Sequence, residues 1–334
     1  MNIELRDFEA RQIRAQITHC WSPEQARVAL HREAREGLLA SPKELSPRWM
    51  YDARGSRLFD SITRLPEYYP TRTELSILHR HAKQIVRRSG AEALVELGSG
   101  TSEKTLALLD AFTAGGQLGY YTPFDVCGPF LALAANQVSA AYPSLLVDGV
   151  VGDFERHLCQ MPEHGRRLVA FLGSTVGNLR PKARARFYQE LSSTLGSGEW
   201  LLLGVDLLKD RTVLHDAYND AQGVTAEFNL NVLRMLNREL SAQFIPDHFR
   251  HLARFDEEQG HIEMFLQSTK AQATPLPELG ITVRFEEGEC LRTEISTKFR
   301  PDQVEAELAA ADFGIREWWT DEMGYFALTL VERL

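Results

Sequence analysis

The sequence predicts an α/β fold with a mostly parallel sheet and a second, smaller α+β unit. Between residues 91 and 208, short apolar runs alternate with segments of helical spacing, which is typical of βαβ units. The stretch 210–299 breaks this rhythm, and a chain of 334 residues has room for about two domains. With 44% hydrophobic and 25% charged residues, the chain is predicted to be neither disordered nor fibrous.

Helical spacing marks residues 23–39 and 73–88 in the N-terminal part, and an irregular, aromatic-rich stretch, 46–72, separates them. Five strands of the parallel sheet are expected next, and helices at 102–112 and 129–141 follow the first two of them. The strand ranges are 92–100, 117–126, 145–154, 166–175 and 198–208.

The second unit is expected to begin with a helix over 215–240 and to continue as antiparallel strands within 251–269 and 281–299. A helix at 300–314, with Pro301 suited to its first turn, and two strands within 315–334 then complete the first sheet. We therefore expect three parts: a helical N-terminal segment, 1–80, that contributes to the second unit; an insertion, 210–299; and a core made of 81–209 and 300–334.

Charge and composition exclude several classes of partner. Subtracting 46 acidic from 37 basic residues leaves a net charge of −9, which argues against nucleic-acid binding. The longest apolar run, 200–208, is too short to span a membrane, and the charged N-terminus does not resemble a secretion signal. The cysteines show no disulfide or zinc-ligand spacing, so we expect a cytoplasmic protein without a metal. They are Cys20, Cys127, Cys159 and Cys290.

The segment ELGSGTSEKT indicates a nucleoside-binding site, because it follows a strand and opens a helix. Gly98 and Gly100 let the backbone approach a ligand closely. Asp125 ends the next strand, where a carboxylate can accept both hydroxyls of a ribose. Asp153 and Phe154 follow the third strand and suit the amino group and the ring of adenine.

The residue types of this loop favour S-adenosylmethionine over a nicotinamide dinucleotide. A dinucleotide loop, GxGxxG, has glycine where this chain has Glu103, and a carboxylate there repels a pyrophosphate. S-adenosylmethionine has no phosphate, and its sulfonium and ammonium groups tolerate acids such as Glu96. The last segment, GYFALTLVERL, suits the reversed final strand of class I methyltransferases.

Substrate-binding candidates lie on later segments. Asn178 follows the fourth strand at the sheet edge that binds ligands, where its amide can donate to a carboxylate and accept from an amine, or simply hold a turn. Tyr68 and Tyr218 carry hydroxyl groups but can equally belong to the core. Glu294 and Ser296 lie two residues apart on a strand and so share a face, which can grip a ring N–H or face solvent.

Six segments, in this order, resemble the ergothioneine-pathway histidine Nα-methyltransferases. They are YDARGSRLFDSITRLPEYYPTR, ELGSGTSEKT, GDF, FLGSTVGNL, AYNDAQGVTAEFN and LRTEISTKF. The resemblance covers the chain from about Ser46 to Leu334. It implies a Rossmann-like class I methyltransferase core with a substrate-binding α+β domain. It also implies trimethylation of L-histidine to its betaine, hercynine, with three molecules of S-adenosylmethionine.

The resemblance also implies a role for each matching residue. The methyl donor would be held by Gly98, Lys104, Asp125, Asp153 and Phe154. The α-amino-acid end of histidine would be held by Tyr68, Asn178 and Tyr218, and the imidazole by Glu294 and Ser296. Tyr51 and Met264 would line the pocket around the amine and the ring.

We expect Tyr51 and Asn178 to act in catalysis by orienting the amine, and we expect a monomer without a metal. Two alternatives remain at this point: a methyltransferase of the same fold that acts on another amino acid or small amine, and a non-catalytic S-adenosylmethionine-binding module. A nicotinamide oxidoreductase is disfavoured by Glu103.

Overall fold

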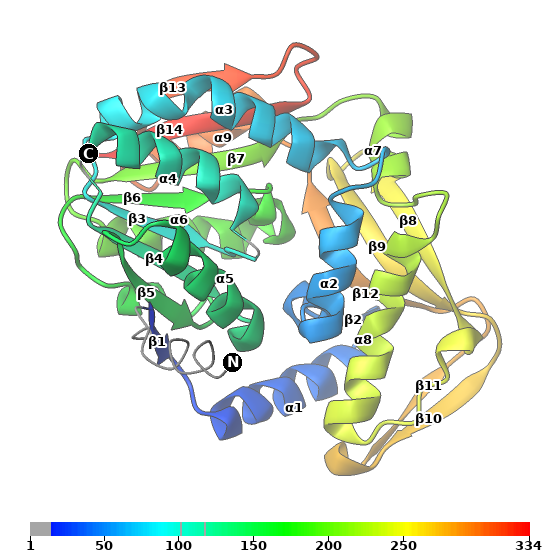
Figure 1. Ribbon diagram of the computed structural model, residues 1–334. Helices are drawn as coiled ribbons and strands as arrows, with labels where there is room; N and C mark the ends of the chain where they lie inside the picture. The colour runs from blue at the N-terminus through cyan, green and yellow to red at the C-terminus, as the bar shows by residue number, and fades with distance from the viewer. Residues whose placement is uncertain (1–14, 101, 117) are drawn as a thin grey trace, which may run out of the picture.

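A computed structural model describes residues 15–100, 102–116 and 118–334, which form two units that lie side by side (Figure 1). The larger unit is built on an eight-stranded sheet of order β1-β5-β4-β3-β6-β7-β14-β13. The six strands from β1 to β7 in this order are parallel, and β14 and β13 are each antiparallel to the strand before them. The strands are β1 (Ala15–His19), β3 (Ala93–Leu97), β4 (Tyr120–Asp125), β5 (Leu146–Val151), β6 (Arg167–Phe171), β7 (Trp200–Asp206), β13 (Phe313–Thr320) and β14 (Phe326–Arg333).

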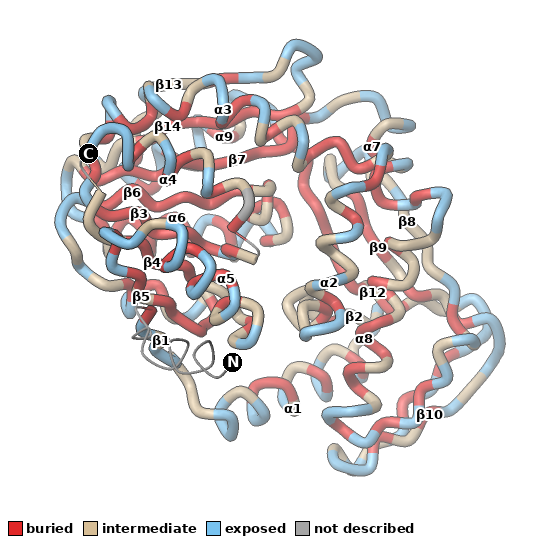
Figure 2. The backbone as a smooth tube through the Cα atoms, viewed as in Figure 1, coloured by how far each residue is buried: buried red, intermediate tan, exposed pale blue. Residues whose placement is uncertain are grey.

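Helices cover both faces of this sheet, so its central strands are buried along nearly their whole length and are mostly apolar. Alternate residues of each strand enter different cores: Leu94 packs with α3, α4 and α5, whereas Val95 packs with α6 and α9. Figure 2 shows the resulting run of buried positions through the sheet. The helices are α3 (Tyr69–Ser89), α4 (Glu103–Gly115), α5 (Gly128–Ala141), α6 (Pro181–Thr194) and α9 (Pro301–Ala309).

The smaller unit combines a four-stranded sheet, β2-β12-β9-β8, with the hairpin β10-β11. A single hydrophobic core joins its N-terminal residues, such as Leu38 and Met50, to late residues such as Phe228 and Leu266. In Figure 1, α2 lies between α5 and α8 and contacts both. The elements are α1 (Pro23–Leu39), β2 (Lys43–Glu44), α2 (Ala53–Ile62), α7 (Arg211–Ala217), α8 (Val224–Leu240), β8 (Phe249–Asp256), β9 (His261–Ser268), β10 (Gln272–Leu276), β11 (Ile281–Phe285) and β12 (Cys290–Thr297).

Short 3₁₀ turns complete the fold: η1 (Pro47–Met50), η2 (Leu158–Gln160), η3 (Thr175–Asn178), η4 (Pro246–His248) and η5 (Pro277–Leu279). Among the described residues, no helix combines the length and the apolar character needed to cross a bilayer.

The predicted α/β class and all five predicted strands of the parallel sheet are confirmed, as β3 to β7. The prediction of an irregular stretch at 46–72 is wrong in part, because it contains α2, whose first turn is capped by Asp52, and the start of α3. The single helix expected over 215–240 is also wrong. Gly223, at a φ of 74°, separates α7 from α8, and Asp220 accepts hydrogen bonds from the first N–H groups of α8. Strand β1 was not predicted.

Candidate active site

A cavity of about 380 Å³ opens at the carboxyl ends of the parallel strands and is walled by both units. This is the edge at which open α/β sheets bind ligands. Residues predicted for both ligands line it: Tyr51, Tyr68, Gly98, Lys104, Asp125, Asp153, Phe154 and Asn178.

The glycine turn after β3 presents open backbone to this cavity. Gly98 and Gly100 have φ values of 70° and 49°, in the left-handed region that favours glycine. A Cβ atom at either position would meet nothing within 4 Å, so conformation rather than crowding requires glycine here. The turn is fixed by the N–H of Gly98, which donates to the carbonyl of Phe124 at 2.8 Å.

Asp125 ends β4 and is held against the same turn. One carboxylate oxygen accepts from the N–H of Gly100 at 3.0 Å, and the other accepts from the N–H of Cys127 at 2.9 Å. Burial raises its pKa, and these backbone donors partly offset that effect. Because each carboxylate oxygen has a further lone pair, the group can still accept two hydroxyls.

Asp153 is joined to the smaller unit by an arginine that sequence reasoning missed. Arg48, on η1, forms ion pairs with Asp153 and with Glu33 of α1. Arg156 approaches the same Asp153 oxygen at 3.5 Å. Arg48 also lines the cavity, so this pair ties the predicted adenine subsite to the N-terminal segment.

Lys104 forms an ion pair with Glu74 at 2.7 Å. Glu74 is fully buried on α3 and accepts the N–H of Gly173 as well, at 2.9 Å. Glu74 is a second residue that the sequence analysis missed. The charge of Lys104 is therefore balanced within the protein, which leaves it as a wall of the cavity rather than a free cation.

The cavity carries an excess of carboxylates. Besides Asp125 and Asp153, it is lined by Glu96 and Glu155. Burial raises the pKa of Glu96 to about 7, and the hydrogen bond that the Tyr121 hydroxyl donates to it at 2.6 Å partly offsets this. An acidic lining suits a sulfonium and an ammonium and repels a pyrophosphate. The side chain of Glu103, on which the dinucleotide argument depended, lies outside the described part of the chain.

Three polar groups of the substrate side have no hydrogen-bond partner in the described part of the chain. Among the described residues, none forms a hydrogen bond with the hydroxyls of Tyr51 and Tyr68 or with the side-chain amide of Asn178, and all three residues line the cavity. Asn178 ends η3, which packs closely against β12. This approach is possible because Gly177 has no side chain, since a Cβ atom there would lie only 2.9 Å from the carbonyl oxygen of Thr297.

Glu294, on β12, lines a second cavity, of about 450 Å³, which shares Ser46, Pro47, Asn178 and Arg180 with the first. Its side chain is buried, and burial raises its pKa to about 7, with Lys298 acting in the opposite direction. Burial also raises the pKa of the Tyr51 and Tyr68 hydroxyls, and the charge of Glu294 is a further cause in both cases. The charge of Glu294 therefore acts on two tyrosines that line the first cavity.

The other predicted substrate residues do not line the cavities but lie behind the residues that do. The Tyr218 hydroxyl hydrogen-bonds Ser296 at 2.7 Å, and its ring packs edge-on against Tyr68 with centroids 6.4 Å apart. Met264 lies opposite Glu294 in the β9–β12 ladder. Neither cavity has Tyr218, Met264 or Ser296 among its described lining residues.

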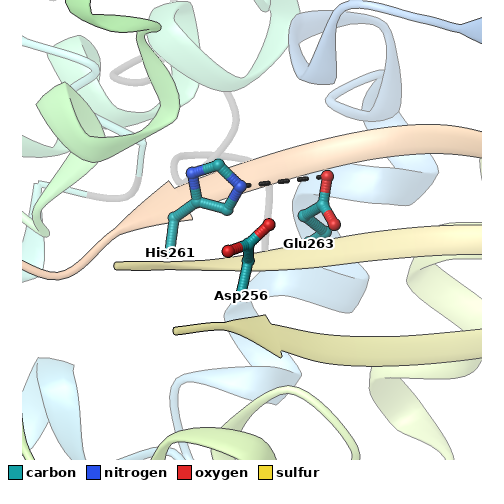
Figure 3. Close-up of side chains that lie close together, drawn as sticks. All are labelled: Asp256, His261 and Glu263. Atoms are coloured by element: carbon teal, nitrogen blue, oxygen red, sulfur yellow. Dashed lines mark ion pairs between the residues drawn. The ribbon is translucent and has the colours of Figure 1, made fainter. Parts of the chain in front are cut away.

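A cluster of His261 with two carboxylates on the β8–β9 hairpin is the sole metal-like grouping among the described residues (Figure 3). Its central carboxylate, Glu263, already accepts from Arg254 at 2.5 Å and from Arg292 at 3.0 Å. The third member is Asp256, and His261 lies 3.8 Å from Glu263. Two guanidinium groups on one carboxylate make this a poor cation site.

The family model described as "Histidine-specific methyltransferase, SAM-dependent" matches residues 30–333. The chain belongs to this family. Histidine N-alpha-methyltransferase of Mycolicibacterium smegmatis is 52% identical over 310 residues, which are 93% of this chain and 97% of the relative. Ergothioneine biosynthesis protein 1 of Neurospora crassa is 33% identical over 238 residues, 69% of this chain and 27% of that protein.

A third relative, 4-dimethylallyltryptophan N-methyltransferase of Claviceps purpurea, is 27% identical over 261 residues, or 71% of this chain and 76% of the relative. Membership of the family settles the choice between a nicotinamide enzyme and an S-adenosylmethionine-dependent one in favour of the latter.

The raised pKa of Glu294 predicts that its ionised carboxylate lowers the free energy of unfolding. An acid whose pKa rises on folding destabilises the folded state above its unfolded pKa, and the cost is complete above its folded pKa. A rise from 4.5 to about 7 corresponds to about 3 kcal/mol of unfolding free energy lost at pH 8. Glu294→Gln should therefore melt at a higher temperature than the wild type at pH 8, with the difference falling to less than half at pH 5.

Glu263→Gln is the matched control on the neighbouring strand. Burial tends to raise the pKa of Glu263, but Arg254 and Arg292 outweigh burial and lower it, so this variant should lose stability at pH 8. Thermal melts at both pH values check the pair. An equal melting difference for Glu294→Gln at pH 5 and pH 8 would contradict the assignment.

Proposed function

We propose that this protein transfers methyl groups from S-adenosylmethionine to the α-amino nitrogen of L-histidine. Three transfers yield hercynine, a step of ergothioneine biosynthesis. The observation that carries the proposal is the position of Asn178. This residue lines both cavities, and so it stands between the acidic nucleoside subsite and the buried Glu294.

The donor side fits a nucleoside without phosphates. Asp125 would accept the two ribose hydroxyls, and Asp153 with Phe154 would contact the adenine. Gly98 and Lys104 would complete the subsite. The carboxylates that line the cavity would balance the positive charge of the ligand. When bound, S-adenosylmethionine supplies a methyl group on a sulfonium, from which an amine can displace it.

The substrate side would position the amine rather than deprotonate it with a strong base. A terminal amine has a pKa of about 8, so a neutral fraction exists near pH 7, and each transfer forms one N–C bond and releases one proton. Tyr51 and Asn178, whose polar groups have no protein partner in the described chain, would aim the nitrogen lone pair. Orientation of this kind contributes up to roughly 7–11 kcal/mol to a bimolecular step.

Tyr68 and Asn178 would hold the carboxylate end. Tyr218, whose hydroxyl is bonded to Ser296 and Lys298, would support Tyr68 through the packing of the two rings. Glu294 with Ser296 would hold the imidazole beside Met264. A buried carboxylate selects a ring that can donate a hydrogen bond. The name of the Claviceps relative gives a tryptophan derivative as its substrate. Recognition of the imidazole ring is therefore the part of the proposal that most needs a test.

Mass spectrometry of L-histidine incubated with the protein and S-adenosylmethionine tests the proposal. We expect products heavier by one, two and three methyl groups. A parallel panel with phenylalanine, tryptophan and small amines separates histidine from other substrates. Binding of the donor without methylation of any of these compounds would instead support a non-catalytic module.

Asn178→Ala should lower kcat/KM for histidine by at least about tenfold, because one buried hydrogen-bonding partner of the substrate is lost. The Kd for S-adenosylhomocysteine should stay within twofold of the wild-type value, since Asn178 is not assigned to the donor. Steady-state kinetics and calorimetry measure the two effects. Wild-type kcat/KM in the variant would show that Asn178 does not orient the amine.

Five further assignments belong to this proposal. We keep 81–209 with 300–334 as the core and 210–299 as the insertion. Of the segment 1–80, β1 and part of α3 pack on the larger unit, and the rest contributes to the smaller unit. We also keep the monomeric state, the cytoplasmic location and the absence of a nucleic-acid partner or a metal as predictions from composition and family resemblance.

A further inference from the structure

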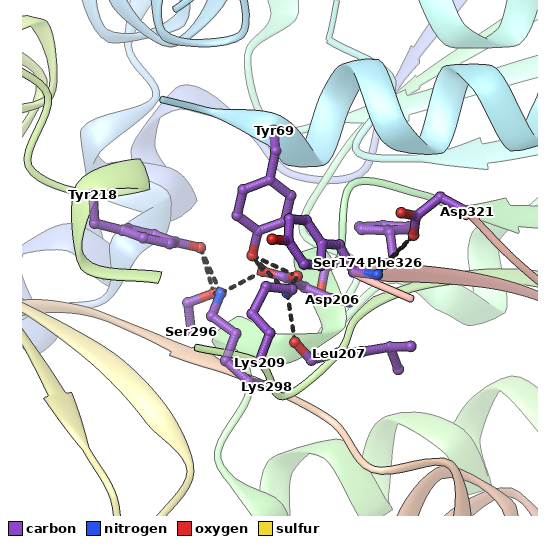
Figure 4. Close-up of polar contacts among 11 residues, drawn as sticks. Tyr69, Ser174, Asp206, Leu207, Lys209, Tyr218, Ser296, Lys298, Asp321 and Phe326 are labelled. Atoms are coloured by element: carbon purple, nitrogen blue, oxygen red, sulfur yellow. Dashed lines mark hydrogen bonds and ion pairs between the residues drawn. The ribbon is translucent and has the colours of Figure 1, made fainter. Parts of the chain in front are cut away.

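A buried lysine that was not among the predicted site residues contacts two of the proposed substrate residues, Tyr218 and Ser296. Lys298 follows β12, and its side chain is fully buried. Its ammonium donates to Asp206 at 2.8 Å, to the Tyr218 hydroxyl at 2.9 Å and to the Ser296 hydroxyl at 2.9 Å (Figure 4). An ammonium has three N–H donors, so these three acceptors use all of them.

Asp206, at the end of β7, is shared with a second lysine. Lys209 donates to Asp206 at 2.5 Å and to the Tyr69 hydroxyl at 2.7 Å, and its side chain is 4% exposed. Tyr69 in turn donates to Asp206 at 2.8 Å. The two lysines therefore have equivalent ion pairs to one carboxylate, but only Lys298 reaches Tyr218 and Ser296.

The direction of the hydrogen bond between the two hydroxyls follows from their relative acidity, because the distance alone allows either to donate. Tyr218 and Ser296 share one hydrogen bond of 2.7 Å, and a phenol is a stronger donor than an aliphatic hydroxyl. Tyr218 therefore donates to Ser296, whose oxygen also accepts from Lys298. Both lone pairs of the Ser296 oxygen are then occupied, so Ser296 can only donate to a further group.

Glu294 presents the opposite chemistry on the same face of β12. It lies two residues from Ser296, and no described residue donates a hydrogen bond to its carboxylate. Ionised, it accepts hydrogen bonds but cannot donate them. Side by side, the two residues offer one acceptor and one donor.

We infer that Lys298 is a positioning residue that makes Ser296 an obligate donor, so that the pair Glu294–Ser296 selects a ring with one N–H and one lone-pair nitrogen. This inference rests on the proposed function and deepens it. It identifies the recognised form of the substrate as the neutral imidazole, which has one nitrogen of each kind. An imidazolium, with two N–H groups, meets an opposing donor at Ser296.

The test compares histidine with its pyrrol-2-yl and pyrrol-3-yl analogues, each of which keeps one ring N–H and replaces the acceptor nitrogen with C–H. For the wild type, kcat/KM should favour histidine over both analogues by at least about tenfold, because the ring carbon leaves the Ser296 donor unpaired. In Lys298→Met, Ser296 is free to rotate, and the preference should fall to within threefold of unity.

Lys209→Met is the matched control. Each of the two variants removes one buried lysine from Asp206 and leaves the other paired with it, so general damage to the network should be alike in both. Lys209→Met should keep the wild-type preference. Binding of S-adenosylhomocysteine, measured by calorimetry, confirms that each variant is folded.

The preference of the wild type is a test that needs no variant, because a value near unity for either analogue overturns the inference. A Lys298→Met enzyme that keeps the wild-type preference also overturns it, as does an equal loss in Lys209→Met. These outcomes differ from failure of the proposed function, in which the wild type does not methylate histidine at all.

Discussion

Replacing Glu294 with glutamine should raise the KM for L-histidine about 10- to 150-fold, because a charge-assisted hydrogen bond to the ring is worth about 1.5–3 kcal/mol. The carboxylate is buried on β12 with no donor among the described residues, so its hydrogen-bonding capacity is left for a ligand. Its loss therefore acts on substrate recognition, while the KM for S-adenosylmethionine should not change.

Glu263→Gln controls for the removal of a carboxylate from this sheet. Glu263 lies opposite Ile295, whose side chain points away from the face of Glu294, and it is paired with arginines. This variant should keep the wild-type KM for histidine. Steady-state kinetics with histidine, phenylalanine and tryptophan measure the selectivity, and an unchanged preference for histidine in Glu294→Gln would refute the role of Glu294.

Asp125→Ala should weaken the binding of S-adenosylmethionine about 10²- to 10⁴-fold. Two hydrogen bonds from ribose hydroxyls to a charged acceptor are lost, at about 1.5–3 kcal/mol each. The variant also frees the N–H groups of Gly100 and Cys127, which Asp125 holds at 3.0 and 2.9 Å, so the glycine turn loses its anchor.

Asp148→Ala is the control for this prediction. Asp148 lies on the adjacent strand β5 and pairs with His164 at 2.9 Å, and it is not among the described residues that line the cavity. Calorimetric titration with S-adenosylmethionine should give a wild-type Kd for this control. A Kd within threefold of wild type for Asp125→Ala would contradict the assigned ribose contact.

The part of the site that follows strand ends was predictable from the sequence. Gly98, Asp125 and Asp153 each end or follow a strand of the parallel sheet, and parallel strands bring their carboxyl ends to one edge. Likewise, Glu294 and Ser296 share a face because side chains alternate along a strand. The alternation of residues along each strand and the position of each strand end were enough to predict where these residues lie.

The partners of these residues were not predictable, because they come from distant parts of the chain. Arg48 and Asp153 are separated by 105 positions, and Lys298 and Asp206 by 92. A buried lysine looks like any surface lysine in a sequence. Asp206 gave a weak signal, since it interrupts the apolar run of β7, and a charge inside a buried strand needs a partner.

Strand β1 and helix α2 escaped prediction for different reasons. β1 is a five-residue edge strand, too short for its periodicity to stand out. Helix α2 is ten residues long and is flanked by aromatic residues and prolines, which resemble loop signals. Its aromatic side chain Phe59 packs with Tyr51 and Phe228 in the core of the smaller unit.

A crystal structure with L-histidine and S-adenosylhomocysteine bound together tests the central claim most directly. We predict the thioether sulfur above the turn at Gly98, the α-amino nitrogen beside Asn178, and one imidazole nitrogen within hydrogen-bonding distance of Glu294. A histidine ring bound elsewhere, with the carboxylate of Glu294 directed into bulk solvent, would contradict the account.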